Sequence, residues 1–490
     1  MFFQLDGEMK NIERILREGA MSEANLNQII QIEIGDWLKS KKREWMLTGE
    51  RYYRNETDIL ERVRTAIGAS GAKEPVGNLA NNKLPNAFTR KLVDQKVGYL
   101  LGKPMSIQTK NKDYHSKLTE IFNDAMLRRI QSIGEEAINK GIAWLHPYYD
   151  ETGMLCFKKM KSEEIIPLWR DEEHTELQAI IRVYDVIVYE GLNRTTVTKV
   201  EWWDTEGVRR YVLQNGLVPD VEAGEVGSHF TLVAGGVESE MNWERVPFIA
   251  WKYNSREQPL VEIIKGLIDD YDKKKSDNSN NLEDLPNSTY VVTNYDGTDA
   301  AEFRKNISTY RVVFVSNEGG VDSVNIEIDT EAYKTHQEQN RKDIYEFGRG
   351  VDTQMASFGS APSGKALRFL YSDLDLDANK IETEFQASLE QLLWFINAHL
   401  YNTTRVDYSN ESVEFVFNRD MPIDESEIID NINKSSGVLS EETLVAQHPW
   451  TKDVREELKR RENEAKKAEA RFEQYNFPKG DETSPKGEEE

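Results

Sequence analysis

The sequence predicts a mainly helical α+β protein, and three observations support this fold class. The chain has 490 residues, enough for two or three domains with cores of their own. Residues 329–401 carry two helical patterns separated by a loop of small and polar residues. Between residues 141 and 253 the apolar residues instead recur at every second position, which is typical of an antiparallel sheet. We therefore expect a sheet region embedded in a predominantly helical chain.

The composition excludes several classes of protein. Lys and Arg total 62 against 86 for Asp and Glu, a formal net charge of -24, so tight unassisted capture of nucleic acid through its phosphates is not expected. The single cysteine, Cys156, excludes an intramolecular disulfide, and we expect it to be a small buried apolar residue in a reducing compartment. No apolar run approaches the roughly 20 residues of a membrane span, and Met1–Lys10 lacks a signal-peptide pattern. We therefore expect a soluble protein made in the cytoplasm.

Helical regions precede the sheet. Residues 8–45 predict two helical segments, and the second ends in a basic patch that we interpret as a solvated helix end, made of Lys39, Lys41, Lys42 and Arg43. A helix at 87–101 has unusually complete boundary signals, because Pro85 lies near its start and Gly102 just past its end. A further helix is expected at 115–140, with one apolar side made of Leu118, Ile121, Phe122, Met126 and Ile130.

The period then changes to two, which predicts strands joined by turn residues. The expected strands are residues 142–149, 154–160, 179–189, 197–203 and 208–213. Trp202 and Trp203 could form a stacking platform for bases, but adjacent residues of a strand point to opposite faces of the sheet. We therefore expect one to pack in the core and the other on the surface.

A stalk with a small knob is expected after the sheet. Residues 258–285 form a helical pattern whose second half is highly polar. A compact island follows, with strands at 290–293 and 311–315 and a short helix at 300–306. Because a second helix begins at residue 329, the two helices bracket this island.

The chain is organised around residues 329–401. The helix at 329–348 has too few apolar residues for a continuous stripe, and a helix that is polar all round rarely packs against an ordinary core. The glycines and small polar residues of 349–362 favour a mobile loop. Residues 363–401 then predict one amphipathic helix of roughly 50 Å at 1.5 Å per residue. A polar helix, a loop and a long rigid helix indicate something other than a pocket enzyme.

Shorter elements close the chain. A strand is expected at 413–418 and a charged helical region at 425–471. Residues 478–490 are too polar and too charged to fold.

The order of these parts resembles that of a known family. The segment Asn81–Pro85, followed by Lys91–Pro104, is similar to the signature helix of the SPP1-type portal proteins of tailed bacteriophages. Further matching blocks are Gly49–Tyr53 with Asp58–Leu60, Ser276–Asp277 with Asn281–Asp284, Asn294–Gly297, and Ser363–Leu367. The similarity runs collinearly from about Ser40 to Glu464, whereas residues 1–35 and 216–240 depart from it.

The resemblance implies a portal fold and a ring, usually of twelve subunits in this family, at one vertex of the capsid. Such a ring conducts double-stranded DNA without sequence specificity during packaging and ejection, binds no cofactor and is not an enzyme. The implied parts are an N-terminal helical segment (1–40), wing (41–255 and 363–424), stem helices (256–288 and 329–348), clip (289–328), tunnel loop (349–362), crown (425–475) and disordered tail (476–490).

The resemblance also implies partners and a location. The terminase large subunit and the head-completion adaptor would bind the clip, where the matching positions are Tyr295, Asp296, Phe303 and Arg304. The major capsid and scaffolding proteins would also bind the ring, and no membrane is involved. The protein would be assembled in the cytoplasm of the host bacterium and reside in the virion, at the portal vertex.

The predicted channel residues follow from the same match. The tunnel-loop positions are Arg349, Asp352, Gln354, Met355, Ser357, Phe358, Ser360 and Lys365, and the stem-wall positions are Lys334, Glu338, Arg341 and Lys342. An acidic wall would keep DNA from adhering, since each phosphate contact would slow translocation. Arg341, Lys342, Arg349 and Lys365 are candidates for transient phosphate contact. The alternative is pairing between subunits or within the helix, as the four-residue spacing of Glu338 and Lys342 allows.

Two other functions stay open. Residues 359–365 fit the first seven positions of a nucleotide-binding P-loop, but Ala366 cannot ligate magnesium and no hydrophobic strand precedes the match, which disfavours an NTPase. The second alternative is an oligomeric scaffold or adaptor that does not conduct DNA.

No metal site is expected. Asp373, Asp375, Asp377 and Glu384 match positions of a calcium loop, but Ala378 replaces its glycine and the helical period continues, so we expect a solvated acidic helix face. The seven histidines show no metal-ligand spacing, and His399 is expected to be a packed residue.

Overall fold

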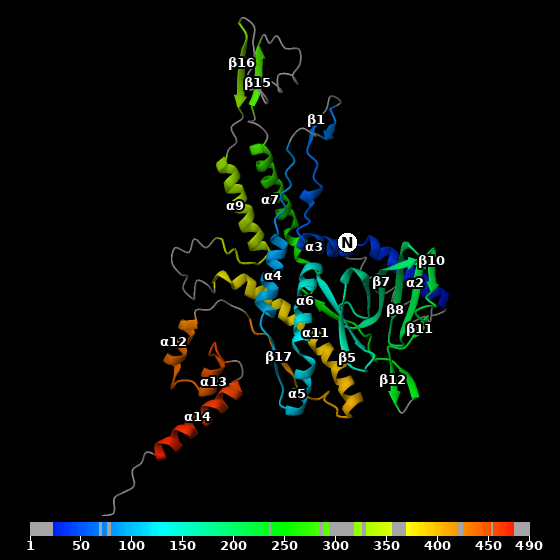
Figure 1. Ribbon diagram of the computed structural model, residues 1–490, viewed down its shortest axis with the longest axis vertical. Coiled ribbons are helices and arrows are strands. Elements are labelled where there is room, and N and C mark those ends of the chain that lie inside the picture. Colours follow the sequence, from blue (N-terminus) through cyan, green and yellow to red (C-terminus); the bar gives the residue numbers. More distant parts are fainter. Residues whose placement is uncertain are drawn as a thin grey trace, which may run out of the picture. The chain divides into compact units, whose positions relative to one another are not determined.

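The computed structural model describes residues 23–67, 71–75, 80–234, 237–283, 288–293, 318–325, 330–354, 369–419, 425–451 and 454–474. The chain forms two compact units (Figure 1). Unit 1 consists of Met1–Gln354 and Ser372–Asp420, and unit 2 of Met355–Tyr371 and Met421–Glu490. The expected mixture of helices and antiparallel sheets is confirmed, since every pair of named strands in the described ranges is antiparallel.

The first described helices are α2 (Glu23–Lys39) and α3 (Lys41–Tyr53). The basic patch spans the junction of the two helices. Ser40 lies within it and caps the start of α3, because its hydroxyl accepts a hydrogen bond from the Arg43 N–H at 3.2 Å. The interpretation of the patch as a solvated helix end is wrong for Lys42, which pairs with the buried carboxylate of Glu257.

The predicted signature helix is confirmed as α4 (Phe88–Leu101). The single helix expected at 115–140 is wrong, because the chain forms α5 (Lys112–Ile121) and α6 (Asp124–Lys140). The side chain of Asn123 caps α6 by accepting hydrogen bonds from the N–H groups of its first turn, at 3.0 and 3.2 Å. The apolar period continues across this break, which concealed it in the sequence. Short elements around these helices are η1 (Asp58–Glu61), β1 (Thr65–Ile67), β2 (Lys73–Pro75) and β3 (Ser106–Gln108).

The sheet region consists of two main sheets. One has the strand order β14-β4-β5, formed by Ile249–Lys252, Ile142–Tyr149 and Leu155–Met160. The other has the order β10-β9-β8-β7-β6, formed by Gly216–Pro219, Val208–Gln214, Asn193–Trp203, Leu177–Glu190 and Ile165–Trp169, with β11 (Val226–Gly227) also on β9. The helix η2 (Ser162–Glu164) and the hairpin of β12 (Phe230–Ala234) and β13 (Val237–Met241) complete the region. The five expected strands are confirmed, but β6, β10, β11, β12, β13 and β14 were not predicted.

The core of this region is aromatic and aliphatic. Trp202 is buried in it, and Trp203 lies half-buried against it with its ring 4.9 Å from that of His146. Both tryptophans therefore serve packing, as expected. Cys156 is only half-buried, with its thiol 3.7 Å from the Asp150 carboxylate, so the prediction of a buried apolar residue is wrong.

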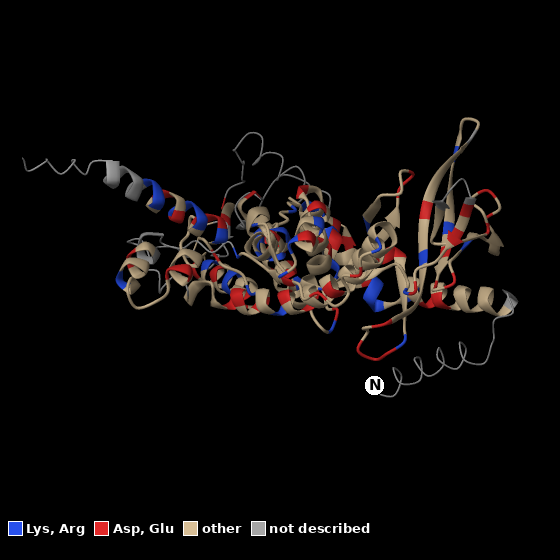
Figure 2. Ribbon diagram, turned by 90° about the horizontal axis from the view of Figure 1, so that it is seen from below, with Lys and Arg blue, Asp and Glu red and all other residues tan. Residues whose placement is uncertain are grey.

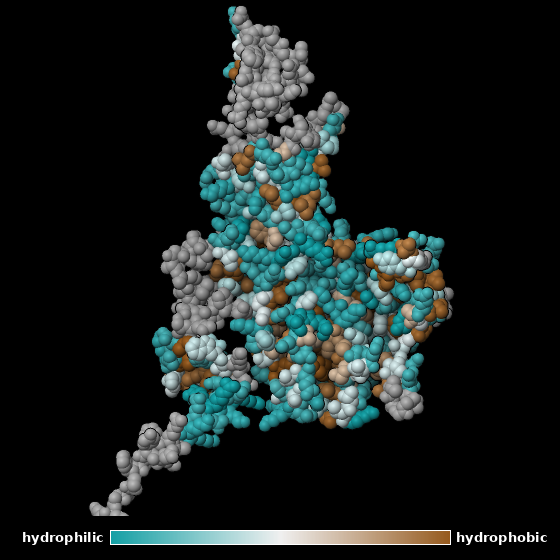
Figure 3. All heavy atoms as spheres, viewed as in Figure 1, coloured by the Kyte–Doolittle hydropathy of each residue, from teal (hydrophilic) through white to brown (hydrophobic). Residues whose placement is uncertain are grey.

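The expected stalk is formed by α7 (Leu260–Glu283) and α9 (Thr330–Phe347). These helices lie side by side, and the hairpin of β15 (Ser288–Thr293) and β16 (Gly320–Asn325) lies beyond their ends (Figure 1). The strand and short helix expected at 311–315 and 300–306 lie outside the described residues. The visible face of the stalk is mostly hydrophilic, with scattered hydrophobic residues (Figure 3).

A polar ladder attaches the segment 82–86 to α7. The three backbone contacts are Asn82 N to Asn280 Oδ1 (2.6 Å), Leu84 N to Ser276 Oγ (3.0 Å) and Asn86 N to Asp272 Oδ1 (3.1 Å). The contacts recur because four residues of a helix rise about 6 Å, close to the roughly 6.6 Å that two extended residues span. One side of the polar second half of α7, made of Asp272, Ser276 and Asn280, is therefore buried by an antiparallel extended segment.

The Asp272→Asn variant is expected to raise the free energy of unfolding at pH 7. Burial raises the pKa of Asp272 from 3.8 to about 6, so the folded state retains a proton that the unfolded state loses between these values. The ionised carboxylate thus costs stability above pH 6, by about 3 kcal/mol, and the cost disappears as the pH falls toward 3.8. Denaturant unfolding should show the gain at pH 7 and little gain at pH 4. Glu262→Gln, an exposed change on α7, is the control; a less stable Asp272→Asn chain at pH 7 would contradict the prediction.

The long helix is confirmed as α11 (Ser372–Thr404), although residues 363–368 of the expected range lie outside the described residues. It is followed by β17 (Glu414–Val416), which pairs with β3 and confirms the strand expected there. In unit 2 the charged region forms α12 (Glu425–Ser435), α13 (Glu441–Ala446) and α14 (Val454–Gln474). The expected tail at 476–490 lies outside the described residues.

Candidate functional site

The solvent-exposed side of α9 carries three of the four predicted stem-wall residues. The helix buries only Asn340, Ile344 and Tyr345, whereas Lys334, Glu338 and Lys342 are exposed. Their spacing of four residues aligns them on one side of the helix. In the described part of the chain these three side chains form no ion pair, and Lys342 does not pair with Glu338. They are therefore available to solvent or to a ligand.

The fourth residue, Arg341, is engaged inside the chain. Its guanidinium donates two hydrogen bonds to the carboxylate of Asp352, both at 2.7 Å, and lies 5.3 Å from the ring centre of Tyr345. Burial opposes ionisation of Asp352, but these hydrogen bonds hold its pKa below the ordinary value. Charge-assisted bidentate pairs are among the strongest hydrogen bonds in proteins. Arg341 therefore holds the chain after α9 in place.

The residues after α9 lie on α4, and we call residues 349–353 the loop root. Gln95 pairs with the backbone of Val351 in both directions, because its amide donates to the carbonyl at 2.7 Å and accepts from the N–H at 3.1 Å. Lys91 donates to the Thr353 hydroxyl at 3.2 Å. A Cβ at Gly350 would lie 2.1 Å from Cδ2 of Leu92, so a larger residue there would force the buried Leu92 side chain to move. Side chains of α4 therefore hold the loop root in place through hydrogen bonds and close packing.

The other predicted site residues divide into two groups. Gln354 is exposed, with its N–H bonded to Asp352 at 3.0 Å, and Arg349 is half-buried with its guanidinium 3.6 Å from Asp377. Met355, Ser357, Phe358, Ser360 and Lys365 lie outside the described residues, as do Tyr295, Asp296, Phe303 and Arg304 and the P-loop match at 359–365.

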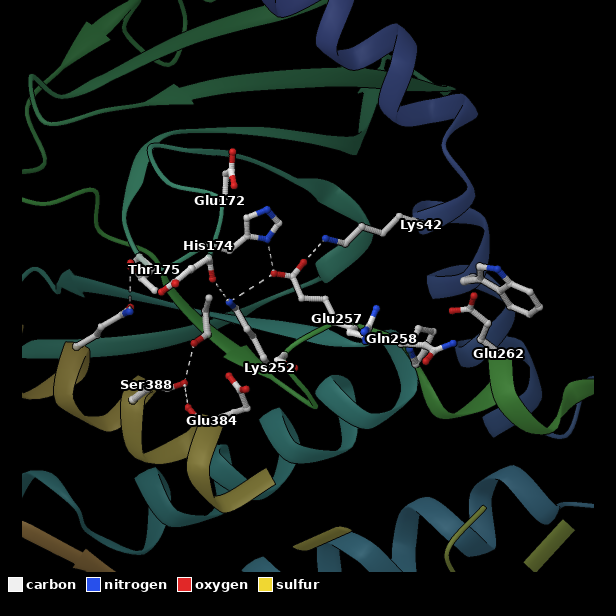
Figure 4. Close-up of a pocket in the computed structure, with 18 of the residues that line it drawn as sticks. Lys42, Glu172, His174, Thr175, Lys252, Glu257, Gln258, Glu262, Glu384 and Ser388 are labelled. Carbon is white, nitrogen blue, oxygen red and sulfur yellow. Dashed lines mark hydrogen bonds and ion pairs between the residues drawn. The ribbon is translucent and has the colours of Figure 1, made fainter. Parts of the chain in front are cut away.

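A charged pocket of about 930 Å³ lies in unit 1, lined by residues of α3, β14 and α11 (Figure 4), and it was not predicted from the sequence. At its centre Glu257, only 5 % exposed, accepts a hydrogen bond from His174 Nδ1 at 2.7 Å and pairs with Lys42. Burial opposes ionisation, but the His174 and Lys42 contacts lower the pKa of Glu257 to about 2. His174 and Glu257 lie 83 residues apart and both have positive φ, 58° and 53°, so no local pattern pointed to them.

The pocket does not form a hydrolytic triad. Ser388 lines it together with His174 and Glu257, but the single Ser388 hydroxyl proton is shared between the backbone carbonyls of Ala250 at 2.7 Å and Glu384 at 2.9 Å (Figure 4). A nucleophilic serine needs a hydrogen bond to its base, and no such bond joins Ser388 to His174 in this pocket. The arrangement fits a structural charge cluster.

The described ranges contain no group of three His, Cys, Asp or Glu side chains placed to hold a metal ion. The calcium-loop match lies on the continuous helix α11, but the expected solvated acidic face is wrong for Asp377, which is buried and bound to Lys96. His399 packs against Tyr149, as expected. Among the described helices, none has the length and apolar character needed to span a membrane. Basic and acidic residues are intermixed along the helices, so no basic face stands out in this view (Figure 2).

Comparisons with known proteins identify relatives. The family described as "Phage portal protein, SPP1 Gp6-like" matches residues 39–471. The portal protein of Bacillus phage SPP1 is 31% identical over 425 residues, covering 86% of this chain and 84% of the relative. The portal protein of Clostridium phage phiCD119 is 30% identical over 431 residues, covering 85% and 91%.

Among solved structures, the neck of an empty GTA particle matches with a TM-score of 0.40 and 12% identity, covering 77% of this chain and 96% of that chain. The virion of a native gene transfer agent particle matches with a TM-score of 0.39 and 11% identity, covering 76% and 95%. The sequence matches decide the family, since they span most of the chain and include the helix α4 and the stalk described above. This chain belongs to the SPP1 Gp6-like family of phage portal proteins.

Proposed function

We propose that copies of this chain form a ring, of twelve subunits as is usual in the family, at one vertex of the capsid. The ring is the conduit for double-stranded DNA during packaging and ejection. The observation that carries this proposal is the polarity of α9, which buries three residues and leaves the others in contact with solvent or half-buried. A helix this polar is stable when one side faces a water-filled bore and another faces neighbouring subunits.

The charge of α9 suits a conduit. Glu331, Glu338, Asp343 and Glu346 stand against Lys334 and Lys342 once Arg341 is paired with Asp352, a balance of -2 per subunit on this helix. Such a wall repels phosphates on balance, so DNA passes without being held. Lys334 and Lys342 are then the exposed cations that make brief phosphate contacts, whereas Arg341 is occupied.

The remaining parts take the roles that the resemblance implies. Residues 256–288 and 329–348 are the stem, and 289–328 are the clip, which binds the terminase large subunit and later the head-completion adaptor. The wing (41–255 and 363–424) meets the capsid and scaffolding proteins, and residues 425–475 form the crown. The protein is assembled in the host cytoplasm and ends in the virion. ATP hydrolysis belongs to the terminase.

Electron microscopy of the purified protein tests this proposal. Closed rings with a central hole wide enough for a DNA duplex support the conduit, and a packaging reaction that fails without the ring supports its role. Filaments or compact dimers would instead favour a scaffold that does not conduct DNA. Nucleotide hydrolysis by the isolated chain would favour the NTPase alternative.

Reversing a charge on the solvent-exposed side of α9 is expected to slow the passage of DNA through the ring. The Glu338→Lys variant adds an exposed cation in every subunit, so the rings should retain DNA more strongly at low salt. Retention should increase about threefold per phosphate contact formed when salt is lowered from 200 to 50 mM. Filter retention and packaging rate measure this effect. The control is Glu151→Lys, an equal charge change at an exposed turn of the β4–β5 hairpin, and equal behaviour of both variants would contradict the prediction.

A further inference from the structure

A buried charged cluster lies beneath the loop root. Lys96 of α4 is 1 % exposed, and its ammonium donates to the carboxylate of Asp377 of α11 at 2.6 Å. The buried hydroxyl of Tyr253 donates to the same carboxylate oxygen at 2.8 Å. The Arg349 guanidinium lies 3.6 Å from the other oxygen. One carboxylate thus accepts two hydrogen bonds and pairs with a guanidinium, and these three groups come from distant parts of the chain.

The same ammonium also reaches the chain that leaves α9. Lys96 Nζ donates to the backbone carbonyl of Arg349 at 3.2 Å, two residues after α9 ends at Phe347. Asp377 lies in the second turn of α11, so Lys96 contacts both the departing and the returning ends of the connection between the two helices. Arg349 and Asp377 are 28 residues apart in sequence, and both contact the Lys96 side chain.

Two neighbouring side chains of α4 also contact these ends. The Gln95 amide pairs with Val351 of the departing chain, and the Tyr99 hydroxyl donates to Asp375 of the returning helix at 2.9 Å. Lys96 bonds to both ends through one ammonium. Arg349 itself has a positive φ of 50°, a conformation that a non-glycine residue keeps when its surroundings fix it.

The energetics of the cluster favour a role in geometry over one in stability. Burial lowers the pKa of Lys96, because the charged ammonium has left water. Desolvation of a buried ion pair commonly cancels its attraction, so an apolar or neutral pair of similar shape is often equally stable. What a neutral pair lacks is the directional attraction that holds two chain ends on one atom.

We propose that Lys96 is a positioning residue that fixes the separation between the end of α9 and the start of α11. Where this concerns DNA it rests on the proposed conduit: the loop root keeps one position in every subunit, so the bore has a uniform rim at this level. The proposal itself concerns a distance within one chain and can be measured without DNA.

The test uses two variants of the full chain. Lys96→Met/Asp377→Asn removes both charges while keeping similar shapes and an acceptor for Tyr253. Lys91→Met is the matched control, since Lys91 contacts only the departing end, at Thr353. Thermal unfolding checks folding, and the double variant should unfold within about 5 °C of the parent chain. A parent carrying Cys156→Ser accepts labels at Glu346 and Leu376, both exposed, at the end of α9 and the start of α11.

Pulsed electron paramagnetic resonance then measures the distance between the two labels, with labelled chains diluted in unlabelled ones so that only distances within one chain contribute. The parent and Lys91→Met should give one narrow distribution. The double variant should give a shifted distribution or one at least twofold broader. A narrow, unshifted distribution in a folded double variant would overturn the proposal. If rings of the parent chain did not support DNA packaging, the proposed conduit would be overturned. The proposal about Lys96 would stand, because the distance measurement does not involve DNA.

Discussion

The Glu257→Ala variant is expected to lower the free energy of unfolding of unit 1 by about 3–5 kcal/mol, the cost of breaking a buried ion pair by removing one partner. The carboxylate accepts from His174, pairs with Lys42 and lies 3.7 Å from Lys252. Without it, Lys42 of α3 and Lys252 of β14 lose their shared anion, and His174 loses its hydrogen-bond partner. The loss should appear as a lower midpoint in denaturant unfolding. Glu172→Ala, an exposed change in the same pocket, should have little effect.

The pH dependence gives this prediction a second, independent readout. The folded pKa of Glu257, about 2, is lower than its ordinary value of 4.5, so its contribution is present above pH 4.5 and is lost as the pH falls toward 2. The change corresponds to about 3 kcal/mol. Glu257→Ala should therefore differ from the parent chain at pH 7 and approach it at low pH. Parallel stability curves for the two chains would contradict the assignment.

Much of the fold could be predicted because local signals mark it. The boundaries of α4 follow from Pro85 and Gly102, and the low apolar content of 329–348 separates α9 from the core helices. The break between α5 and α6 was missed because one side chain, Asn123, ends a helix without interrupting the apolar period. The apolar period reports only which side of a helix is buried, so it does not reveal a residue such as Asn123 that ends one helix and caps the next.

The candidate site was less predictable because its contacts join distant residues. Arg341 resembles a free channel cation until the chain turns back 11 residues later and brings Asp352 to it. Lys96 belongs to the signature helix, but its partner Asp377 lies 281 residues away. His174 and Glu257 meet across 83 residues, and both have a positive φ that periodicity does not predict. Periodicity reports which side of an element is buried and is silent about which charges meet there.

The Gly49→Ala variant is expected to lower the free energy of unfolding by about 3 kcal/mol, because no space exists for one added carbon. Gly49 lies where α3 crosses α6, and a Cβ there would lie 1.8 Å from the backbone oxygen of Asn139. A side chain could rotate away, but a helix backbone can yield only if the two helices separate, and overpacking of this kind costs about 1–3 kcal/mol or more. Separation would also disturb the hydrogen bond from Tyr52 of α3 to Asp269 of α7. The thermal midpoint should therefore fall by about 4 °C.

Gly35→Ala is the matched control, because Gly35 also lies inside a helix, α2, but has no atom within 4 Å of the added carbon. Alanine is the better helix former by about 1 kcal/mol, so this variant should be slightly more stable than the parent chain. The same substitution thus has opposite signs at two helical glycines, and the difference isolates the close approach of α3 and α6. Equal stabilisation of the two variants would mean that α3 and α6 lie farther apart than in this structure. It would also mean that α3 does not support α7 through the hydrogen bond from Tyr52.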